Sequence, residues 1–461
     1  MSVDDSYLPF LNGAELHLAD RMGAVAGEGG RTSFSVWAPN ARTVELALGS
    51  EADPGDVLPL TQGSGGIWHA RDVDAPVGTW YRYAITGADG ERRLRSDPLA
   101  RRAAPRPSAC STVERSNHTW QDGDWMTRRA AADLRQAPLS IYEVHLGSWR
   151  RDASDPGRQL PWAQLADPLA DHALSLGFTH VELLPVTAHP YPGSWGYLST
   201  GYFAPDPRHG TPDELRALID HLHGRGLGVI LDWVPGHFSA DDWALADFDG
   251  GPTYEHEDPR RADQPEWGAR VFDHSKPQVR SFLLSSARYW LSEFHADGLR
   301  IDAVAAMLRH DWGRDTAAVL PNEDGSLEKH ESIAFLKELN VMVRSEAPGA
   351  VTIAEEATGW PGVTNADGLD FTFAWNMGWA NDWLSYLEKA PAERSTIHND
   401  ITFASSYADA EDWVLVLSHD DAAGSSLVER IWGDDEQARA QLRALIAMQW
   451  AHRGKKLLFM G

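Results

Sequence analysis

The chain has 461 residues, of which 67 are acidic and 41 are basic, so its formal net charge is −26. This length predicts about two or three domains, and a hydrophobic content of 43% is enough for normal cores, which excludes a disordered or collagen-like protein. The negative charge argues against nucleic acid and against an anionic membrane as partners, because both are bound through basic patches.

The sequence predicts a cytoplasmic, monomeric protein without a membrane anchor. Its first ten residues, MSVDDSYLPF, lack the charged and apolar segments of a signal peptide. No apolar run approaches the length of about 20 residues that spans a bilayer. Cys110 is the single cysteine, so an internal disulfide is impossible, which fits a reducing compartment.

Tryptophan is unusually frequent, with 20 residues against 14 phenylalanines and 11 tyrosines. Most are expected in the core, but Trp195, Trp233, Trp360 and Trp379 lie in loop-like segments rich in small and polar residues. A flat apolar face with a polar N–H group suits the faces and hydroxyl edges of a sugar. Composition alone leaves core packing and a neutral polyhydroxylated ligand as equal alternatives.

Residues 30–105 are predicted to form a small antiparallel β-sandwich. Apolar residues alternate there at period two, as in Val44, Leu46 and Leu48, and turn-rich segments such as residues 53–55 separate the runs. Residues 1–29 form a lead-in to this domain, and the charged, Ala-rich residues 106–138 are expected to be a linker.

Residues 139–461 alternate short apolar runs with longer amphipathic stretches, a pattern typical of parallel strands and helices. The helix-like stretches include 212–224, 277–294 and 333–344. Eight strand-like runs favour a (β/α)8 barrel. A doubly wound open sheet is the alternative, weakened because no GxGxxG motif follows a run. The runs are 141–146, 180–186, 228–234, 298–304, 351–355, 371–375, 414–418 and 457–460.

The eighth run ends at Gly461 without a following helix. An uncovered parallel strand would expose apolar surface. We therefore expect either that the sequence is a fragment whose C-terminal domain is missing, or that another element covers this edge.

Charged residues stand at the ends of four predicted strands. The C-terminal ends of barrel strands meet at one mouth, so these side chains are expected to be neighbours although they lie far apart in the sequence. In chain order they are Asp232, His237, Arg300, Asp302, Glu355, His419 and Asp420.

Converging carboxylates with Arg and His suit cleavage of a glycosidic bond. One ionised carboxylate attacks the anomeric carbon while a protonated one protonates the departing oxygen, and retention of configuration needs about 5–5.5 Å between them. Arg300 and Asp302 are two residues apart on a strand, so they share a face, and the cation would favour the ionised carboxylate. The carboxyl group that acts as the acid is expected to be partly protonated near neutral pH.

Each residue also has a structural interpretation. Asp232 at a strand end is, taken alone, more often a helix N-cap than a catalytic group. Arg300 and Asp302 would also form an ordinary salt bridge, and His419 would fit a core histidine. A metal site is the weaker chemical alternative, because no HxH motif follows the first strand and His237 and His419 are isolated.

Four sequence blocks, in this order, resemble the α-amylase superfamily, glycoside hydrolase family 13. They are DWVPGH at 232–237, GLRID at 298–302, AEEA at 354–357 and SHD at 418–420. Over about residues 30 to 461, longer stretches resemble the 1,4-α-glucan (glycogen) branching enzymes within that superfamily. These are YEVHLGSW at 142–149, GSWGY at 193–197, VILDWVPGHF at 229–238, DAVA at 302–305 and KKLLFMG at 455–461.

The resemblance implies catalytic roles for three carboxylates. Asp302 matches the nucleophile that forms a glycosyl-enzyme, Glu355 matches the general acid/base, and Asp420 matches the stabiliser of the transition state. Arg300 matches the residue that positions the nucleophile.

The resemblance also implies a substrate site. His237 and His419 match the histidines that hold hydroxyls of the donor sugar, and Asp232 matches a supporting carboxylate. Tyr197 matches an active-site tyrosine near that sugar, and Trp195 is expected to contact the substrate beside it.

The implied reaction cleaves an α-1,4 linkage and transfers the chain through a covalent intermediate to a 6-hydroxyl. Its substrates would be glycogen, amylose or maltooligosaccharides, and it would need no metal or organic cofactor. The sandwich, with WAPNA at 37–41, resembles a carbohydrate-binding module.

One stretch departs from the resemblance. After Asp420 the family continues with Glu-Val-Val-His-Gly-Lys, whereas this chain continues with Asp421 and then Ala-Ala-Gly-Ser. The loop is expected to be about two residues shorter and to lack a His and a Lys. We therefore keep a glucan hydrolase of the same superfamily as an alternative, and an inactive glucan-binding fragment as another because the chain ends on the eighth strand.

Overall fold

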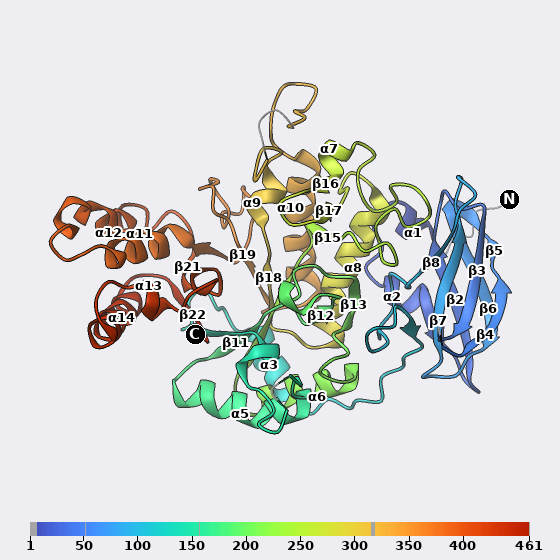
Figure 1. Ribbon diagram of the computed structural model, residues 1–461, viewed down its shortest axis with the longest axis horizontal. Coiled ribbons are helices and arrows are strands. Elements are labelled where there is room, and N and C mark those ends of the chain that lie inside the picture. The colour runs from blue at the N-terminus through green and yellow to red at the C-terminus, as the bar shows by residue number, and fades with distance from the viewer. Residues whose placement is uncertain (1–6, 51, 156, 315–318, 461) are drawn as a thin grey trace.

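The computed structural model describes residues 7–50, 52–155, 157–314 and 319–460. A β-sandwich from the N-terminal part of the chain lies beside a closed parallel barrel of eight strands (Figure 1). This architecture confirms the fold class predicted from the sequence. Within the described residues, no helix is long and apolar enough to cross a membrane.

The sandwich consists of two antiparallel sheets, ordered β1-β2-β6-β5 and β4-β3-β7-β8, with β9 paired to β7. Alternating side chains such as Phe34, Leu46 and Tyr83 are buried between them. The paired strands extend beyond residues 30–105 and include β1 and β9. The sequence did not reveal these two, because they are short edge strands without an alternating apolar pattern. The strands are β1 (Gly23–Ala26), β2 (Arg31–Trp37), β3 (Thr43–Gly49), β4 (Pro54–Pro59), β5 (Thr61–Gln62), β6 (Ile67–Asp74), β7 (Trp80–Thr86), β8 (Arg92–Arg95) and β9 (Ser111–Thr112).

Each of the eight predicted runs overlaps one barrel strand. Parallel barrel strands are buried on both faces and therefore read as continuous apolar runs, which explains why the sequence revealed them. The last strand pairs with the first, with Leu457 opposite Ile141, and this closes the barrel. The strands are β10 (Ser140–Val144), β11 (His180–Leu183), β14 (Gly228–Trp233), β18 (Gly298–Ile301), β19 (Val351–Ala354), β20 (Phe373–Asn376), β21 (Trp413–Leu417) and β22 (Lys455–Phe459).

Helices surround the barrel and include the three predicted stretches as α6, α8 and α10. Thr211 and Glu214 form a capping box that starts α6. The alternation of strand and helix fails once, because residues 355–372 join β19 to β20 without a helix. The principal helices are α5 (Trp162–Ser175), α6 (Pro212–Gly224), α8 (Pro277–Glu293), α10 (His330–Glu346), α11 (Met377–Glu388) and α14 (Asp435–Ala451).

A small three-stranded sheet is inserted between β14 and α8. Its order is β15-β17-β16, and its strands are β15 (His237–Ser239), β16 (Asp263–Gln264) and β17 (Ala269–Val271). Because β15 begins at His237, the insertion fixes this residue just beyond the end of β14.

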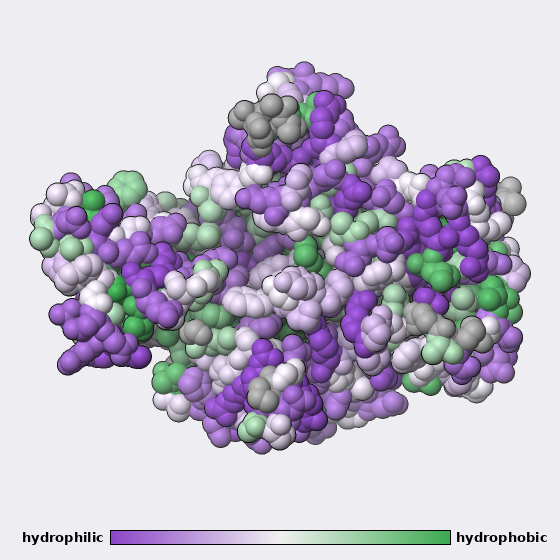
Figure 2. All heavy atoms as spheres, viewed as in Figure 1, coloured by the Kyte–Doolittle hydropathy of each residue, from purple (hydrophilic) through white to green (hydrophobic). Residues whose placement is uncertain are grey.

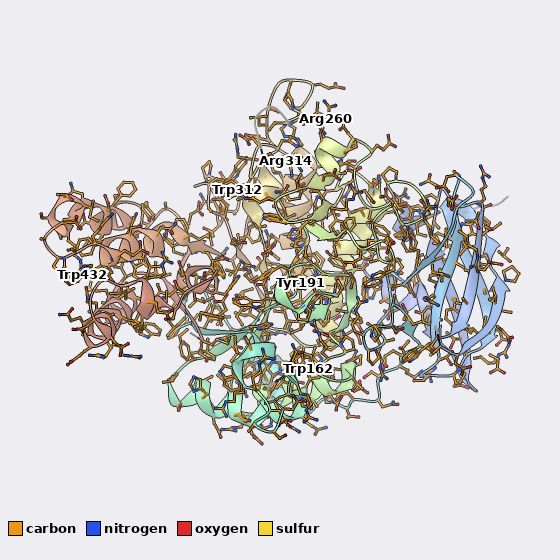
Figure 3. The ribbon with its side chains drawn as sticks, in the orientation of Figure 1. Trp162, Tyr191, Arg260, Trp312, Arg314 and Trp432 are labelled. Carbon is orange, nitrogen blue, oxygen red and sulfur yellow. The ribbon has the colours of Figure 1, made fainter. Side chains whose placement is uncertain are left out.

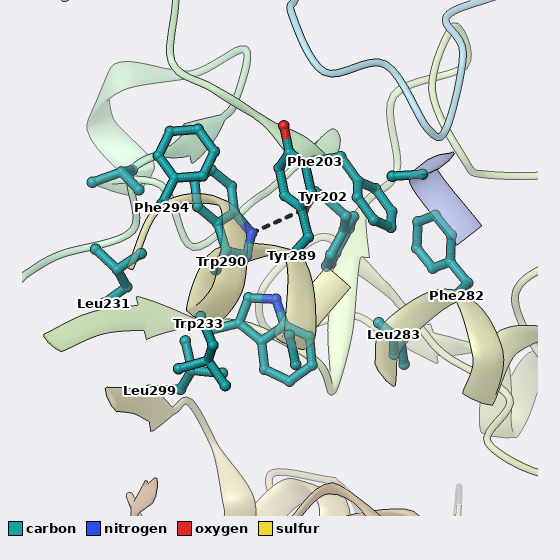
Figure 4. Close-up of a cluster of buried hydrophobic side chains, with 14 of the residues drawn as sticks. Tyr202, Phe203, Leu231, Trp233, Phe282, Leu283, Tyr289, Trp290, Phe294 and Leu299 are labelled. Atoms are coloured by element: carbon teal, nitrogen blue, oxygen red, sulfur yellow. Dashed lines mark hydrogen bonds between the residues drawn. The ribbon is translucent and has the colours of Figure 1, made fainter. Parts of the chain in front are cut away.

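Two of the four tryptophans considered as sugar contacts belong to the core. Trp233 is 2% exposed, and its Nε1 donates a hydrogen bond to Ser286 Oγ at 3.3 Å; it packs in the cluster around Trp290 (Figure 4). Trp379 in α11 is fully buried. For both, core packing is the correct alternative, whereas Trp195 and Trp360 remain half-buried in loops.

The predicted linker is fastened to the floor of the barrel by a buried ionic network. His223 donates from Nδ1 to Asp122 at 2.8 Å and from Nε2 to Asp297 at 2.9 Å. Asp122 precedes α3 (Gly123–Ala131), and Trp125 of that helix donates to Asp297 at 2.8 Å. Burial lowers the pKa of His223, but its hydrogen bonds to the two aspartates outweigh burial and raise it.

We expect His223→Ala to lower the free energy of unfolding by roughly 3 kcal/mol at pH 6, because two buried carboxylates lose the cation that they share, although His295 stays beside Asp122 and Arg129 beside Asp297. The folded pKa of His223 is raised, so its stabilisation is fully present below an unfolded pKa of about 6.5 and is lost as the pH rises through the folded value. Urea unfolding at pH 6 and pH 9 measures both effects.

The matched control is His221→Ala on the same helix, where the imidazole pairs only with the exposed carboxylate of Asp167. A destabilisation by His223→Ala that stayed constant or grew between pH 6 and pH 9 would contradict the assignment of a charged His223.

Candidate active site

Arg300 on β18 organises the mouth of the barrel. Its Nη1 donates to both oxygens of Asp232 and to Asp302 Oδ1, each at 2.9 Å. Its Nη2 lies 3.0 Å from Glu355 Oε2. The guanidinium is 1% exposed and lies over the ring of Trp375, 4.3 Å from the centroid. One cation thus bridges carboxylates from the ends of three adjacent strands, as the sequence predicted for the strand ends.

The carboxylates around Arg300 hold more negative charge than one cation neutralises. Burial raises the pKa of Asp302 well above its usual range, Arg300 lowers it, and Glu355 raises it further. Burial likewise raises the pKa of Glu355, again against Arg300. The attraction expected to keep Asp302 ionised is present, but burial outweighs it. Burial and mutual repulsion therefore disfavour simultaneous ionisation of Asp302 and Glu355.

A strained residue joins the nucleophile candidate to the acid/base candidate. Ala303 has φ 50°, a left-handed conformation that side-chain-bearing residues rarely adopt. This turn lets its N–H donate to Glu355 Oε2 at 2.6 Å, while Val304 N donates to Glu355 O at 3.0 Å. The loops after β18 and β19 are therefore tied together, and Asp302 and Glu355 with them.

A second chain of hydrogen bonds crosses the mouth from β10. Glu143 accepts from His419 Nδ1 at 2.6 Å and from its backbone N at 2.7 Å. His419 Nε2 lies 2.9 Å from the hydroxyl of Tyr197, which donates to Asp232 Oδ2 at 2.6 Å. Burial lowers the pKa of His419, but Glu143 outweighs it and raises the value to about 9. His419 is thus an imidazolium at neutral pH.

His237 and Trp195 line the same mouth. His237 donates from Nε2 to the carbonyl of Tyr197 at 3.0 Å, and its Nδ1 lies 4.0 Å from Asp302 Oδ2. Burial lowers its pKa to about 4, so this imidazole is neutral. The ring of Trp195 lies 6.1 Å from that of His419.

Asp420 begins the loop after β21, with Oδ1 3.5 Å from His419 Nε2 and a side chain that is 46% exposed. The next residue, Asp421, accepts a hydrogen bond from the backbone N of Ser418 at 2.8 Å, and burial raises its pKa to about 6. The carboxylate of Asp421, which stands where the resembled family has Glu, therefore points back onto the end of β21. Contacts connect all the predicted site residues: Trp195, Tyr197, Asp232, His237, Arg300, Asp302, Glu355, His419 and Asp420.

Sequence reasoning missed Glu143, which is fully buried and holds His419. The available signal was a carboxylate inside an apolar strand, where a charge is costly unless it is paired. Its register neighbour on β11, Glu182, is also fully buried, and burial raises its pKa well above the usual range. In the part of the chain that the structure describes, no group of His, Cys, Asp or Glu is arranged to hold a metal ion.

The barrel, its carboxylate cluster and the adjoining sandwich resemble the architecture of α-amylase-type enzymes. Residues 21–100 match the family "Carbohydrate-binding module 48 (Isoamylase N-terminal domain)" and residues 170–258 match "Alpha amylase, catalytic domain". The chain is 50% identical over 436 residues to the 1,4-alpha-glucan branching enzyme of Nocardia farcinica, covering 93% of this chain and 58% of that protein. It is 47% identical over 483 residues to the 1,4-alpha-glucan branching enzyme of Mycolicibacterium paratuberculosis, covering 100% of this chain and 65% of that protein.

The chain is therefore similar over most of its length to the 1,4-α-glucan branching enzymes, and part of its barrel matches the alpha amylase catalytic domain. It spans 58% and 65% of the lengths of these two relatives. Solved structures share the fold at lower identity. A putative alpha amylase from Salmonella typhimurium is 22% identical with a TM-score of 0.72, covering 96% of this chain and 73% of that one. A pullulanase from Paenibacillus barengoltzii is 19% identical with a TM-score of 0.73, covering 100% and 76%.

We expect Glu143→Gln to lower the pKa of His419 from about 9 toward the ordinary value of about 6.5, because the amide keeps the shape of the side chain but removes its charge. NMR titration of isotope-labelled histidines measures the shift, and a His419→Gln sample assigns the signal. An imidazole that titrates alike in both proteins would contradict the pairing with Glu143.

Proposed function

We propose that this chain is a retaining transglycosylase that cleaves α-1,4 linkages of a glucan and transfers the released chain to a 6-hydroxyl, forming an α-1,6 branch. The observation that carries the proposal is the bridge of Asp302 and Glu355 by one buried guanidinium at the barrel mouth. The homology to branching enzymes supports the choice of α-1,4-glucans, such as glycogen, amylose and maltooligosaccharides, as substrates.

In the first step, Asp302 attacks the anomeric carbon while Glu355 gives its proton to the departing O4. The bond from C1 to O4 breaks, and a C1 ester to Asp302 forms. In the second step, Glu355 removes the proton of an acceptor 6-hydroxyl, whose oxygen attacks C1 and displaces Asp302. Two inversions at C1 retain the configuration.

The polar network beside the nucleophile supplies contacts for the donor sugar. The imidazolium of His419 is proposed to donate from Nε2 to a sugar hydroxyl in place of the Tyr197 hydroxyl that this nitrogen contacts in the free protein, and the neutral His237 offers the unprotonated nitrogen near Asp302. Asp420 is the most exposed of the three proposed catalytic carboxylates and is proposed to stabilise positive charge on the sugar ring. Trp195 offers an aromatic face at the same mouth.

Hydrolysis is the second candidate function, with water in place of the acceptor hydroxyl. It is favoured by the altered loop, in which Asp421 folds back onto Ser418. For either activity the proposed location is the cytoplasm, because Cys110 as the single cysteine allows no internal disulfide.

We expect Asp302→Ala to abolish formation of α-1,6 linkages from linear amylose, with a rate loss of roughly four orders of magnitude or more, because no glycosyl-enzyme can form. Proton NMR counts α-1,6 linkages, and a reducing-sugar assay counts new chain ends. Asp409→Ala, at a side chain that is 77% exposed, is the control. Full activity of Asp302→Ala would refute the nucleophile, and reducing ends without α-1,6 linkages in the unmodified chain would favour the hydrolase.

We expect a bell-shaped dependence of kcat/KM on pH. Activity falls at low pH because Asp302 and Glu355 are then both protonated and the nucleophile is no longer ionised. Activity falls at high pH because the raised pKa of Glu355 is passed and the general acid loses its proton. With α-maltosyl fluoride, whose leaving group needs no proton, Glu355→Gln should keep the first step and lose the basic limb of that step. A basic limb that survives in Glu355→Gln would assign it to another group.

A further inference from the structure

A groove of about 540 Å³ lies at the rim of the barrel mouth and is lined by Trp312 and Trp360. This volume falls within the range of about 300–1,000 Å³ that is typical of ligand sites. One wall is formed by residues between 309 and 313, which come directly after α9 (Val304–Leu308) in the sequence. The other wall is formed by residues 358–361 in the loop between β19 and β20. Trp312 lies beside these loops in Figure 3, and Figure 2 shows that the molecule is hollowed there among mainly hydrophilic residues.

The wall that carries Trp360 is held rigidly next to the general acid. Glu356 directly follows Glu355, and its carboxylate accepts hydrogen bonds from the backbone N of Thr358 at 2.7 Å and of Trp360 at 3.0 Å. Farther along the loop, Glu411 accepts from the backbone of residues 362–364 at 2.7 to 3.0 Å. Two buried or half-buried carboxylates thus fix Trp360 relative to the acid.

The opposite wall starts at the nucleophile. Asp302 and Ala303 lead directly into α9, and Trp312 follows that helix. Between them, Arg309 donates to both oxygens of Asp311, at 2.9 and 2.8 Å. This pair is electrically neutral as a unit and lines the groove with hydrogen-bonding groups. Two aromatic faces with a neutral polar rim suit an uncharged polyhydroxylated chain rather than a phosphate or an acidic ligand.

The position of the groove identifies which part of a glucan it would hold. A general acid must stand on the side of the departing oxygen, and the acceptor of a double displacement enters on that side. One wall of the groove, residues 358–361, follows Glu355 in the same loop, whereas the proposed donor-sugar contacts Tyr197 and His419 come from other loops. We propose that Trp312 and Trp360 form a subsite for the α-glucan chain that accepts the transferred segment; this inference rests on the proposed function.

The first test is equilibrium binding without turnover. Maltoheptaose is titrated into the Asp302→Ala protein by calorimetry, alone and combined with Trp312→Ala or Trp360→Ala. We expect each tryptophan change to weaken binding about three- to tenfold, because one stacking face is lost. Trp432→Ala is the matched control, since this tryptophan is 43% exposed and lies on the separate lobe with α11 and α14 (Figure 3). Unchanged affinity in both groove variants would overturn the proposal.

The second test separates the acceptor from the departing chain. In the active protein, loss of the acceptor subsite lets water compete for the glycosyl-enzyme, so the ratio of α-1,6 linkages to new reducing ends should fall about three- to tenfold. Trp312→Phe and Trp360→Phe should restore most of the ratio. A ratio that stays constant while both products decline would overturn the acceptor assignment.

The two tests also separate this inference from the proposed function. If the unmodified chain forms no α-1,6 linkages, the transglycosylase and the acceptor assignment are both wrong. The calorimetric result then still decides whether the groove binds glucan. If α-1,6 linkages form and neither tryptophan alters binding or the ratio, only the groove assignment fails.

Discussion

The site depends on one buried cation shared by three carboxylates. Arg300 is almost fully inaccessible, and removing its charge from water is costly unless the guanidinium is paired with opposite charge. Asp232, Asp302 and Glu355 supply that pairing from the ends of β14, β18 and β19. Because the guanidinium is planar with fixed donor directions, it sets the relative positions of the two groups that are proposed to act on one glycosidic bond. The excess of carboxylates over cations disfavours ionisation of both groups at once, which favours a protonated acid beside an ionised nucleophile.

Closure of the barrel is a condition for the rest of the site. Glu143 lies on the first strand and His419 follows the seventh, so they are far apart in the sequence and meet only because β22 joins β10 to β21. The bond makes His419 a permanent cation at neutral pH and orients it toward Tyr197. The first strand contributes no proposed catalytic group itself. Through Glu143, however, it controls the charge of His419, a proposed substrate contact at the mouth.

The sequence predicted the strands and the cluster for the same physical reason. Strands buried on both faces are apolar along their length, so a charged residue at the end of one is conspicuous. Residues inside a strand gave a weaker signal, since the inward direction of Glu143 depends on a register that only the folded sheet defines. Trp233 and Trp379 show the same limit, because small and polar sequence neighbours do not reveal that a side chain points into the core. His223 holds the linker through Asp122, 101 residues away, and no local pattern encodes that contact.

Acidic side chains in this chain have three different surroundings, and under the proposed function this division lets one mouth treat two sugar chains differently. Asp302 and Glu355 would change charge during the proposed reaction, and both contact Arg300. Glu143 holds a fixed charge and keeps the donor side polar. Glu356 and Glu411 anchor backbone on the other side and leave its surface to aromatic rings. A glycosyl-enzyme is open to attack by water, so transfer requires that a sugar occupy the acceptor side more favourably than water does. In the proposed reaction, flat apolar faces on the acceptor side favour a sugar over water, while hydrogen bonds from charged groups on the donor side hold the covalently bound chain.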